Sequence, residues 1–185
     1  MQNAVLDVIH SRRSVRRYRP DPVPQDALEA VLDAALWAPS ACNEQPWHFT
    51  ALVSSGRIDA LDQASRSALA TAPLEWAAAL AKNPAFRMFY GAPTVVVVSG
   101  RKDEAFPAVV DCSIAAQNLV LAAESLGLSS CWIGLTYWYF QTEGARRELE
   151  IPEGYEPLFA VTLGYREGPA LPGPERKGHP VTILH

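Results

Sequence analysis

The chain has 185 residues, of which 49% are hydrophobic and 19% are charged, as is typical of a globular protein with a sizeable core. Its 16 Lys and Arg residues against 20 Asp and Glu residues give a formal net charge of −4, which argues against nucleic acid as a partner. The three cysteines are widely spaced and odd in number, so we expect neither a disulfide framework nor a cysteine metal site.

The same features predict where the protein works. Cysteines without a disulfide pattern suit a reducing compartment, and the first residues contain no apolar signal region. The most apolar runs are too short or too polar to span a bilayer. We therefore expect a cytoplasmic protein without a membrane partner, built as one domain over residues 1–185.

The first half of the chain predicts helices and strands in alternation. Asn3 can cap a short helix, and three prolines between residues 20 and 24 force an extended connection after it. Apolar residues three and four apart from Leu28 to Leu36 predict an amphipathic helix, which Pro39 ends. Alternation over residues 47–53 predicts a strand covered on both faces. We expect further helices after Ser54 or Ser55 and over 74–82, and a buried central strand over 94–99.

The second half contains the most apolar predicted helix, over residues 107–126 with Gly127 beyond its end. This helix is apolar nearly all round, so in a chain this small we expect a partner subunit to cover one face. Strands are predicted over 129–134 and 158–164, with a helix over 142–150 between them. A Gly- and Pro-rich loop follows over 165–180, and 181–184 predicts a short strand. The mixture indicates an α+β fold, a sheet covered by helices.

Common catalytic motifs are missing from the sequence. No two glycines are separated by two residues, which excludes the GxGxxG dinucleotide fingerprint. The chain has no GxxxxGK[ST] phosphate loop, no HExxH and no GxSxG, and its four histidines never fall at metal-ligand spacing. These absences argue against common hydrolases, nucleoside triphosphatases, zinc enzymes and Rossmann dehydrogenases, and they predict no metal site.

A basic segment near the N-terminus is the first candidate site. Five arginines fall between residues 12 and 19 of an acidic protein. Arginine supplies planar bidentate donors and serine a short hydroxyl donor, a combination that suits a phosphate monoester. In an extended chain Arg12, Ser14 and Arg16 point to one face. The alternative is a solvated basic turn.

Three further segments contain candidate binding groups. Residues 38–47 form a polar loop bracketed by prolines, suited to a planar heterocycle or simply to joining a helix to a strand. The run 129–134 ends in Gly134, where a ligand can approach the backbone, or where a buried strand turns. Arg176 and Lys177 add cations to the same phosphate or belong to a solvated tail.

In chain order these segments resemble the FMN-dependent nitroreductase family. Residues 12–16 match its Arg-x-Ser-x-Arg/Lys motif, and residues 38–47 closely match its Ala-Pro-Ser-x-x-Asn-x-Gln-Pro-Trp motif. Residues 90–94 resemble the Ala-Pro approach to the family's central strand, and residues 117–128 resemble its dimer-core helix. Residues 131–134 fall where the family places the backbone that faces the flavin.

The resemblance implies a fold, an assembly and a set of binding residues. The fold is a three-layer α/β/α sandwich with a mixed, mostly antiparallel sheet, in an intertwined homodimer whose FMN sites lie at the subunit interface. Residues 165–185 form a C-terminal arm that reaches the partner subunit. By similarity the phosphate and polar edge of FMN contact Arg12, Arg13, Ser14 and Arg16, and the partner subunit contributes Pro39, Ser40, Ala41 and Asn43. The backbone of Ile133 and Gly134 faces flavin N5, and Arg176 and Lys177 match late phosphate cations.

The implied activity is an FMN-dependent oxidoreductase with a ping-pong mechanism. NADH or NADPH reduces the flavin at N5, and a nitroaromatic, quinone or similar small acceptor then takes the electrons. The flavin does the chemistry, so no catalytic side chain is expected. A flavin-dependent dehydrogenase or oxidase, a reductive dehalogenase and a non-catalytic flavin-binding or sensor protein remain alternatives. The aromatic residues at 89–90, 106, 132 and 137–140 are either core or pocket walls.

Overall fold

A four-stranded antiparallel sheet lies at the centre of the computed structural model, which describes residues 3–102, 106–170, 172–178 and 181–184. Within these residues the strand order is β1-β2-β4-β3, and every neighbouring pair runs antiparallel. The strands are β1 (Trp47–Leu52), β2 (Thr94–Arg101), β3 (Ser129–Ile133) and β4 (Tyr155–Gly164). The parallel component is an isolated bridge between Ser14 and Ser130.

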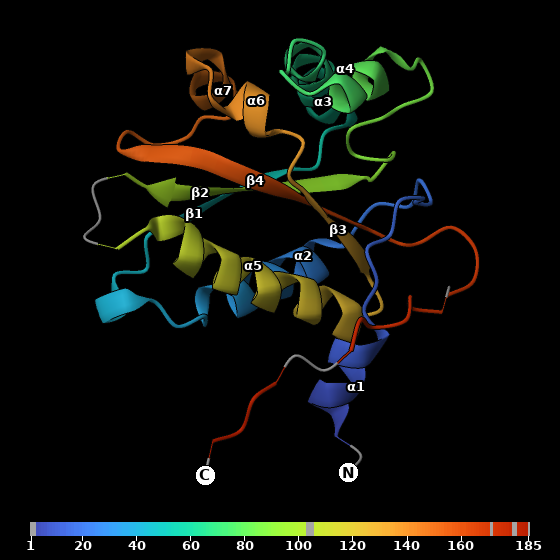
Figure 1. Cartoon of the computed structure of the whole chain (residues 1–185), viewed down its shortest axis with the longest axis vertical. Coiled ribbons are helices and arrows are strands. Elements are labelled where there is room, and N and C mark those ends of the chain that lie inside the picture. Colours follow the sequence, from blue (N-terminus) through green and yellow to red (C-terminus); the bar gives the residue numbers. More distant parts are fainter. Residues whose placement is uncertain (1–2, 103–105, 171, 179–180, 185) are drawn as a thin grey trace.

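Helices cover both faces of the sheet and give three layers (Figure 1). One layer holds α3 (Ser55–Leu69), α4 (Glu75–Lys82), α6 (Tyr137–Phe140) and α7 (Glu143–Glu148). The opposite layer holds α2 (Gln25–Leu36) and α5 (Ala108–Ser125), with α1 (Ala4–Ser11) projecting beyond it. The side chains of β2 divide between two cores, because successive residues of a strand face opposite sides. Val95 and Val97 pack under the α3 layer, and Val96 and Val98 pack against α2 and α5. The predicted α+β three-layer sandwich is confirmed.

The long helix α5 is buried on one side within the chain. Its small inner residues, Ala115, Ala116 and Ala123, are fully buried and allow α2 and the sheet to approach closely. On the outer side Val109, Val110 and Ile114 are 46%, 56% and 38% exposed. A shallow hollow of about 500 Å³ lies there, lined by Val109, Val110, Ser113, Ile114, Gln117 and Asn118. The apolar outer face that the sequence predicted for α5 is therefore present and uncovered by this chain.

Several helix boundaries follow from local signals. The Asn3 side chain accepts hydrogen bonds from the backbone N–H groups of Val5 and Leu6, which confirms the predicted N-cap. Ser54 precedes α3 in an extended conformation without a side-chain capping bond. Thr142 caps α7 through Ala145 N, and Gly127 follows α5 at a φ of +75°, where a residue other than glycine is strained.

The strand β1 lies at a sheet edge and is covered on both faces, as predicted: Leu52 packs in the core under α3, and Trp47 packs in the core with α2 and α5. The structure differs from the predictions in two other places. The strand predicted over 181–184 is wrong: these residues are irregular, with Val181 and Leu184 74% and 89% exposed. A strand needs a partner, and none of the described residues pairs with them. The short helix α6 was not predicted. Residues 171, 179–180 and 185 of the expected arm lie outside the described residues.

Candidate functional site

The basic segment after α1 is extended and joins the edge of the sheet. Ser14 forms a parallel bridge with Ser130 of β3, and Val15 N donates to the Ser130 carbonyl at 2.9 Å. Tyr18 bridges Arg166 just beyond β4, and Arg19 N donates to the Tyr165 carbonyl at 2.8 Å. Because both ends are fixed by backbone hydrogen bonds, the side chains of the segment alternate between two faces.

Arg12, Ser14 and Arg16 share the face that surrounds Cys131 of β3. Burial raises the pKa of the Cys131 thiol, while Arg16, a hydrogen bond with the Ser14 side chain, and Arg12 all act to lower it. Alternation along the extended segment puts these three side chains on one face, and the bridge from Ser14 to Ser130 places the segment beside β3. The shared face predicted from the sequence is thus formed, with donors of the types that bind phosphate.

Tyr18 fixes this segment to the interior. Its hydroxyl oxygen lies 2.8 Å from Thr162 Oγ1, which in turn donates to the Cys131 carbonyl at 3.2 Å. Burial raises the pKa of Tyr18, so the phenol stays neutral. A buried hydrogen-bonded chain therefore holds the basic segment, β4 and β3 in one arrangement.

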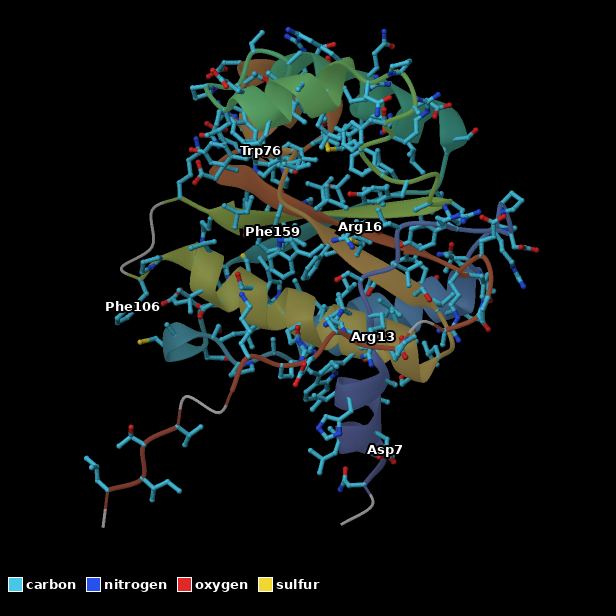
Figure 2. All side chains as sticks on the ribbon, turned by 45° about the vertical axis from the view of Figure 1, so that its right-hand side comes forward. Asp7, Arg13, Arg16, Trp76, Phe106 and Phe159 are labelled. Carbon is cyan, nitrogen blue, oxygen red and sulfur yellow. The ribbon has the colours of Figure 1, made fainter. Side chains whose placement is uncertain are left out.

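Arg13 has different surroundings from the other predicted residues of the segment. Its Nη1 donates to the carbonyls of His10 and Arg12 at 2.6 and 2.8 Å, which closes the end of α1. Its guanidinium lies against Gly173 of the arm, where an added Cβ would come 2.5 Å from Nη2. Figure 2 shows Arg16 at the level of the sheet and Arg13 lower, at the end of α1. Arg13 thus contacts the arm, while Arg12, Ser14 and Arg16 gather at β3.

Ile133 and Gly134 lie where β3 leaves the sheet. The Ile133 side chain is buried in the core under α3, so only its backbone is available to a ligand. Gly134 is exposed, and a Cβ there would meet no atom within 4 Å. Its carbonyl accepts a hydrogen bond from Tyr137 N at 3.1 Å, which begins α6. The open backbone at this edge allows a planar ring to approach closely.

The loop between α2 and β1 is strained and internally hydrogen-bonded. Cys42, Asn43 and Gln45 have φ values of +50°, +59° and +47°, a region that residues other than glycine rarely occupy. Ser40 Oγ accepts from Gln45 N at 2.9 Å, and the Gln45 amide nitrogen donates to Asn43 Oδ1 at 3.2 Å. Such strain is common at ligand-binding positions.

This loop lies far from the basic segment of the same chain. Ala41 N donates to Asp111 Oδ2 in the first turn of α5, and Trp47 pairs with Gly100 near the end of β2. Ser130 lies opposite Leu163, which pairs with Thr94 at the other end of β2. Six residue steps of an extended strand separate Thr94 from Gly100, a distance of about 20 Å. The two motif segments therefore cannot contact one small ligand within a single chain.

The remaining predicted residues lie on the arm. Arg176 and Lys177 are exposed, and in the described part of the chain neither side chain forms a hydrogen bond or ion pair with the basic segment. The arm runs from β4 past the end of α1 and along the α5 layer (Figure 1). Among the described residues no three His, Cys, Asp or Glu side chains gather as metal ligands, and no helix is long and apolar enough to cross a membrane.

Two residues near the site make contacts that the sequence did not predict, Tyr90 having been interpreted as either core or pocket wall. The Tyr90 ring lies under Arg16, with the guanidinium carbon 5.8 Å from the ring centroid. Asp62, 8% exposed on α3, accepts hydrogen bonds from Met88 N and Phe89 N, next to Tyr90. The available signal was the position of Asp62, which shares the buried face of its helix with Ile58, Ser65 and Leu69.

Comparisons of the sequence and of the structure with known proteins agree with one another. The sequence model described as the nitroreductase family matches residues 9–165. A putative NADH dehydrogenase/NAD(P)H nitroreductase of Methanothermobacter thermautotrophicus is 35% identical over 164 residues, covering 87% of this chain and 76% of the relative. The crystal structure of a nitroreductase with bound FMN from Bacteroides fragilis has a TM-score of 0.92 at 33% identity, covering 100% of both chains. A second nitroreductase with bound FMN, from Desulfitobacterium hafniense, has a TM-score of 0.89 at 29% identity, again covering 100% of both chains. The chain belongs to the nitroreductase family.

Proposed function

We propose that this protein is an NAD(P)H-dependent FMN oxidoreductase that passes electrons to small oxidised acceptors such as nitroaromatics or quinones. Membership of the nitroreductase family supports this activity, as do the two related structures that contain FMN. The nicotinamide donor and the acceptor use one site in turn, which gives ping-pong kinetics.

The observation that carries the proposal is the extended basic segment joined to β3 by the bridge between Ser14 and Ser130, which places Arg12, Ser14 and Arg16 on one face at the sheet edge. Two guanidinium groups and a hydroxyl supply the charge and the donors that a ribityl phosphate requires. The exposed backbone at Gly134, at the end of the same strand, leaves open space for a flat ring system. The residues present therefore fit FMN.

When bound, FMN supplies the hydride and electron transfer that protein side chains cannot perform. The protein binds and orients the cofactor: Arg12, Ser14 and Arg16 hold the phosphate and polar edge, and the Ile133 and Gly134 backbone faces N5. Arg13 closes the end of α1 and stays within reach of the same edge, and Arg176 and Lys177 extend the basic surface on the arm. No side chain is assigned as a general acid, base or nucleophile.

A homodimer completes the site. Pro39, Ser40, Ala41 and Asn43 lie about 20 Å along the sheet from the basic segment, so we assign them to the FMN bound mainly by the partner subunit. The uncovered apolar face of α5 offers the surface for this contact. Apolar side chains of α1 and of the arm are also exposed, namely Val5, Leu6, Ile9, Val181, Ile183 and Leu184. A two-fold dimer buries all of them in one interface.

The test is a visible absorbance spectrum of the purified protein with and without added FMN, followed by anaerobic NADH and then NADPH. We expect flavin bands that shift on binding and bleach with at least one nicotinamide, faster than free FMN does. Bound flavin that neither nicotinamide reduces would replace the oxidoreductase proposal with a flavin-binding protein of another kind. An unchanged spectrum of free FMN in the presence of the protein would overturn the cofactor assignment itself.

A further inference from the structure

The turn between α4 and β2 places one aromatic ring at the proposed flavin site. Tyr90 has a φ of +56° and Gly91 a φ of +73°, so two consecutive residues adopt the left-handed conformation. A tyrosine rarely adopts this conformation, which persists only where the surroundings impose it. The Tyr90 ring is half-buried and packs edge-on against Phe86, with ring centroids 6.5 Å apart.

The surroundings that impose this conformation come from α3. The buried Asp62 carboxylate accepts hydrogen bonds from Met88 N at 2.6 Å and from Phe89 N at 3.4 Å. The Met88 and Phe89 side chains are each 1% exposed, so the turn is also fixed by packing. The position of Tyr90 is therefore set from the core and does not depend on Arg16.

Arg16, in contrast, has a long side chain on an exposed extended segment. Among the described residues it forms no ion pair, and its contact with Tyr90 is a cation–π interaction with 5.8 Å between the guanidinium carbon and the ring centroid. An aromatic partner attracts the guanidinium without neutralising it, so the charge and the N–H donors remain for an anion. An arginine already ordered in this way loses less conformational freedom when it binds a ligand.

We propose that Tyr90, fixed by Asp62, is a positioning residue that preorganises Arg16 for FMN. This inference rests on the proposed function, since FMN is the anion that Arg16 binds. The aromatic ring of Tyr90, and not its hydroxyl group, orders the Arg16 side chain.

The chain offers a matched control. The Arg19 guanidinium carbon lies 5.1 Å from the ring centroid of Tyr165, the same kind of interaction at an arginine outside the proposed site. The main variant is Tyr90→Asn, because asparagine tolerates the left-handed conformation while removing the ring. Tyr90→Leu removes the ring with a different side chain, Tyr90→Phe keeps it, and Tyr165→Leu removes the control ring.

The experiment measures the FMN dissociation constant of each full-length variant by quenching of flavin fluorescence, with thermal unfolding of the apoproteins in parallel. We expect Tyr90→Asn and Tyr90→Leu to weaken FMN binding by about 3- to 30-fold. Tyr90→Phe and Tyr165→Leu should stay within about twofold of the unmodified protein. On an Arg16→Ala background, Tyr90→Asn should have no further effect, because the two residues act through one contact.

Three results would overturn the inference. Equal losses in Tyr90→Phe and Tyr90→Asn would assign the effect to the hydroxyl group. An undiminished loss on the Arg16→Ala background would show that Tyr90 acts independently of Arg16. Unchanged FMN affinity in a folded Tyr90→Asn or Tyr90→Leu variant would remove the role altogether. An unmodified protein that does not bind FMN would instead overturn the proposed function, and the inference with it.

Discussion

Arg12 and Arg16 illustrate how neighbouring residues of one type acquire different surroundings. Both lie near Cys131 together with Ser14, whereas the intervening Arg13 donates to carbonyls at the end of α1. The alternation of an extended chain produces this division, and the bridge between Ser14 and Ser130 fixes its register. Residues of identical charge in one short run therefore acquire different surroundings, and the proposed function assigns binding to the face that holds Arg12 and Arg16.

The first prediction concerns the proposed phosphate contacts. Arg12→Ala and Arg16→Ala should each weaken FMN binding by about 1.5–3 kcal/mol, the range for a hydrogen bond to a charged group. Calorimetric titration of the apoprotein with FMN measures this loss. Arg17→Ala is the matched control, since Arg17 is exposed and pairs with Glu167 at 3.0 Å. Affinities that fall equally in all three variants would indicate a general charge effect in place of specific contacts.

A second prediction concerns the buried carboxyl of Asp62. Burial raises its pKa, and hydrogen bonds from Met88 N and Phe89 N and the charges of Arg66 and Arg87 only partly oppose this rise. Because the folded-state pKa lies above the unfolded one, the stability that this group contributes is present below the unfolded pKa, about 4, and is lost as the pH rises through the folded value.

Asp62→Asn removes this titration. Urea unfolding midpoints of both proteins are measured at a series of pH values from about 4 upward. The midpoint of the variant should rise relative to that of the unmodified protein as the pH increases. The side-chain oxygen of asparagine still accepts from Met88 N, so the turn is retained. A difference between the two midpoints that stays constant with pH would contradict the assignment.

At the scale of elements, α5 combines two surfaces. Alanines on its inner face pack against the sheet layer, and Val109, Val110 and Ile114 remain exposed on its outer face. An exposed apolar face of this extent on a helix of 18 residues is characteristic of an interface. The same helix also fixes the loop at 39–43 through Asp111. The surface proposed for dimer formation and the contact that places this loop thus belong to one element.

The third prediction follows from that outer face. Val110→Lys should weaken the dimer by more than about tenfold, because an unpaired ammonium group is costly to bury. Sedimentation velocity measures the dissociation, and far-ultraviolet circular dichroism checks that the fold is retained. Val53→Lys is the control, because Val53 is similarly exposed, at 60%, but lies directly after the edge strand β1 and not on α5. Equal sedimentation of both variants and the unmodified protein would exclude α5 from the interface.

In the whole molecule the two motif segments, residues 12–16 and 38–47, join the sheet toward opposite ends of its strands. The loop at 39–43 leads into β1 opposite Gly100, whereas the segment at 12–16 joins β3 beside Leu163, which pairs with Thr94. Thr94 and Gly100 are six residue steps of β2 apart, or about 20 Å. The proposed function therefore divides each FMN site between two chains, with residues 12–16 from one and residues 39–43 from the other. In that proposal two chains related by a two-fold axis form two complete sites.

The fourth prediction concerns this dependence on assembly. Dilution that converts the dimer to monomers should release FMN over the same concentration range, since monomers retain only half of the contacts. Flavin fluorescence, which increases on release, and the dimer fraction can be followed in one dilution series. A monomer that keeps FMN with undiminished affinity would refute the shared site.

The sequence by itself determined most of the elements and the composition of the site. Caps, apolar spacing and β-branched runs are local signals, so the Asn3 cap, a helix through 28–36 and a strand over 94–99 follow from neighbouring residues alone, and the structure extends these to 25–36 and 94–101. The Arg-x-Ser-x-Arg spacing likewise determines a shared face once the chain is extended. The family followed from the order of such motifs, and the match over residues 9–165 confirmed it.

Only the tertiary structure decided which distant residues meet. The contact of Tyr90 with Arg16, the hydrogen bonds from Met88 and Phe89 to Asp62, and the packing of Gly173 on Arg13 each join segments far apart in the chain. The failure of 181–184 to form a strand has the same origin, because strand pairing requires a partner that local propensity cannot supply. Local periodicity specifies elements, whereas strand register and core packing specify the distances between them.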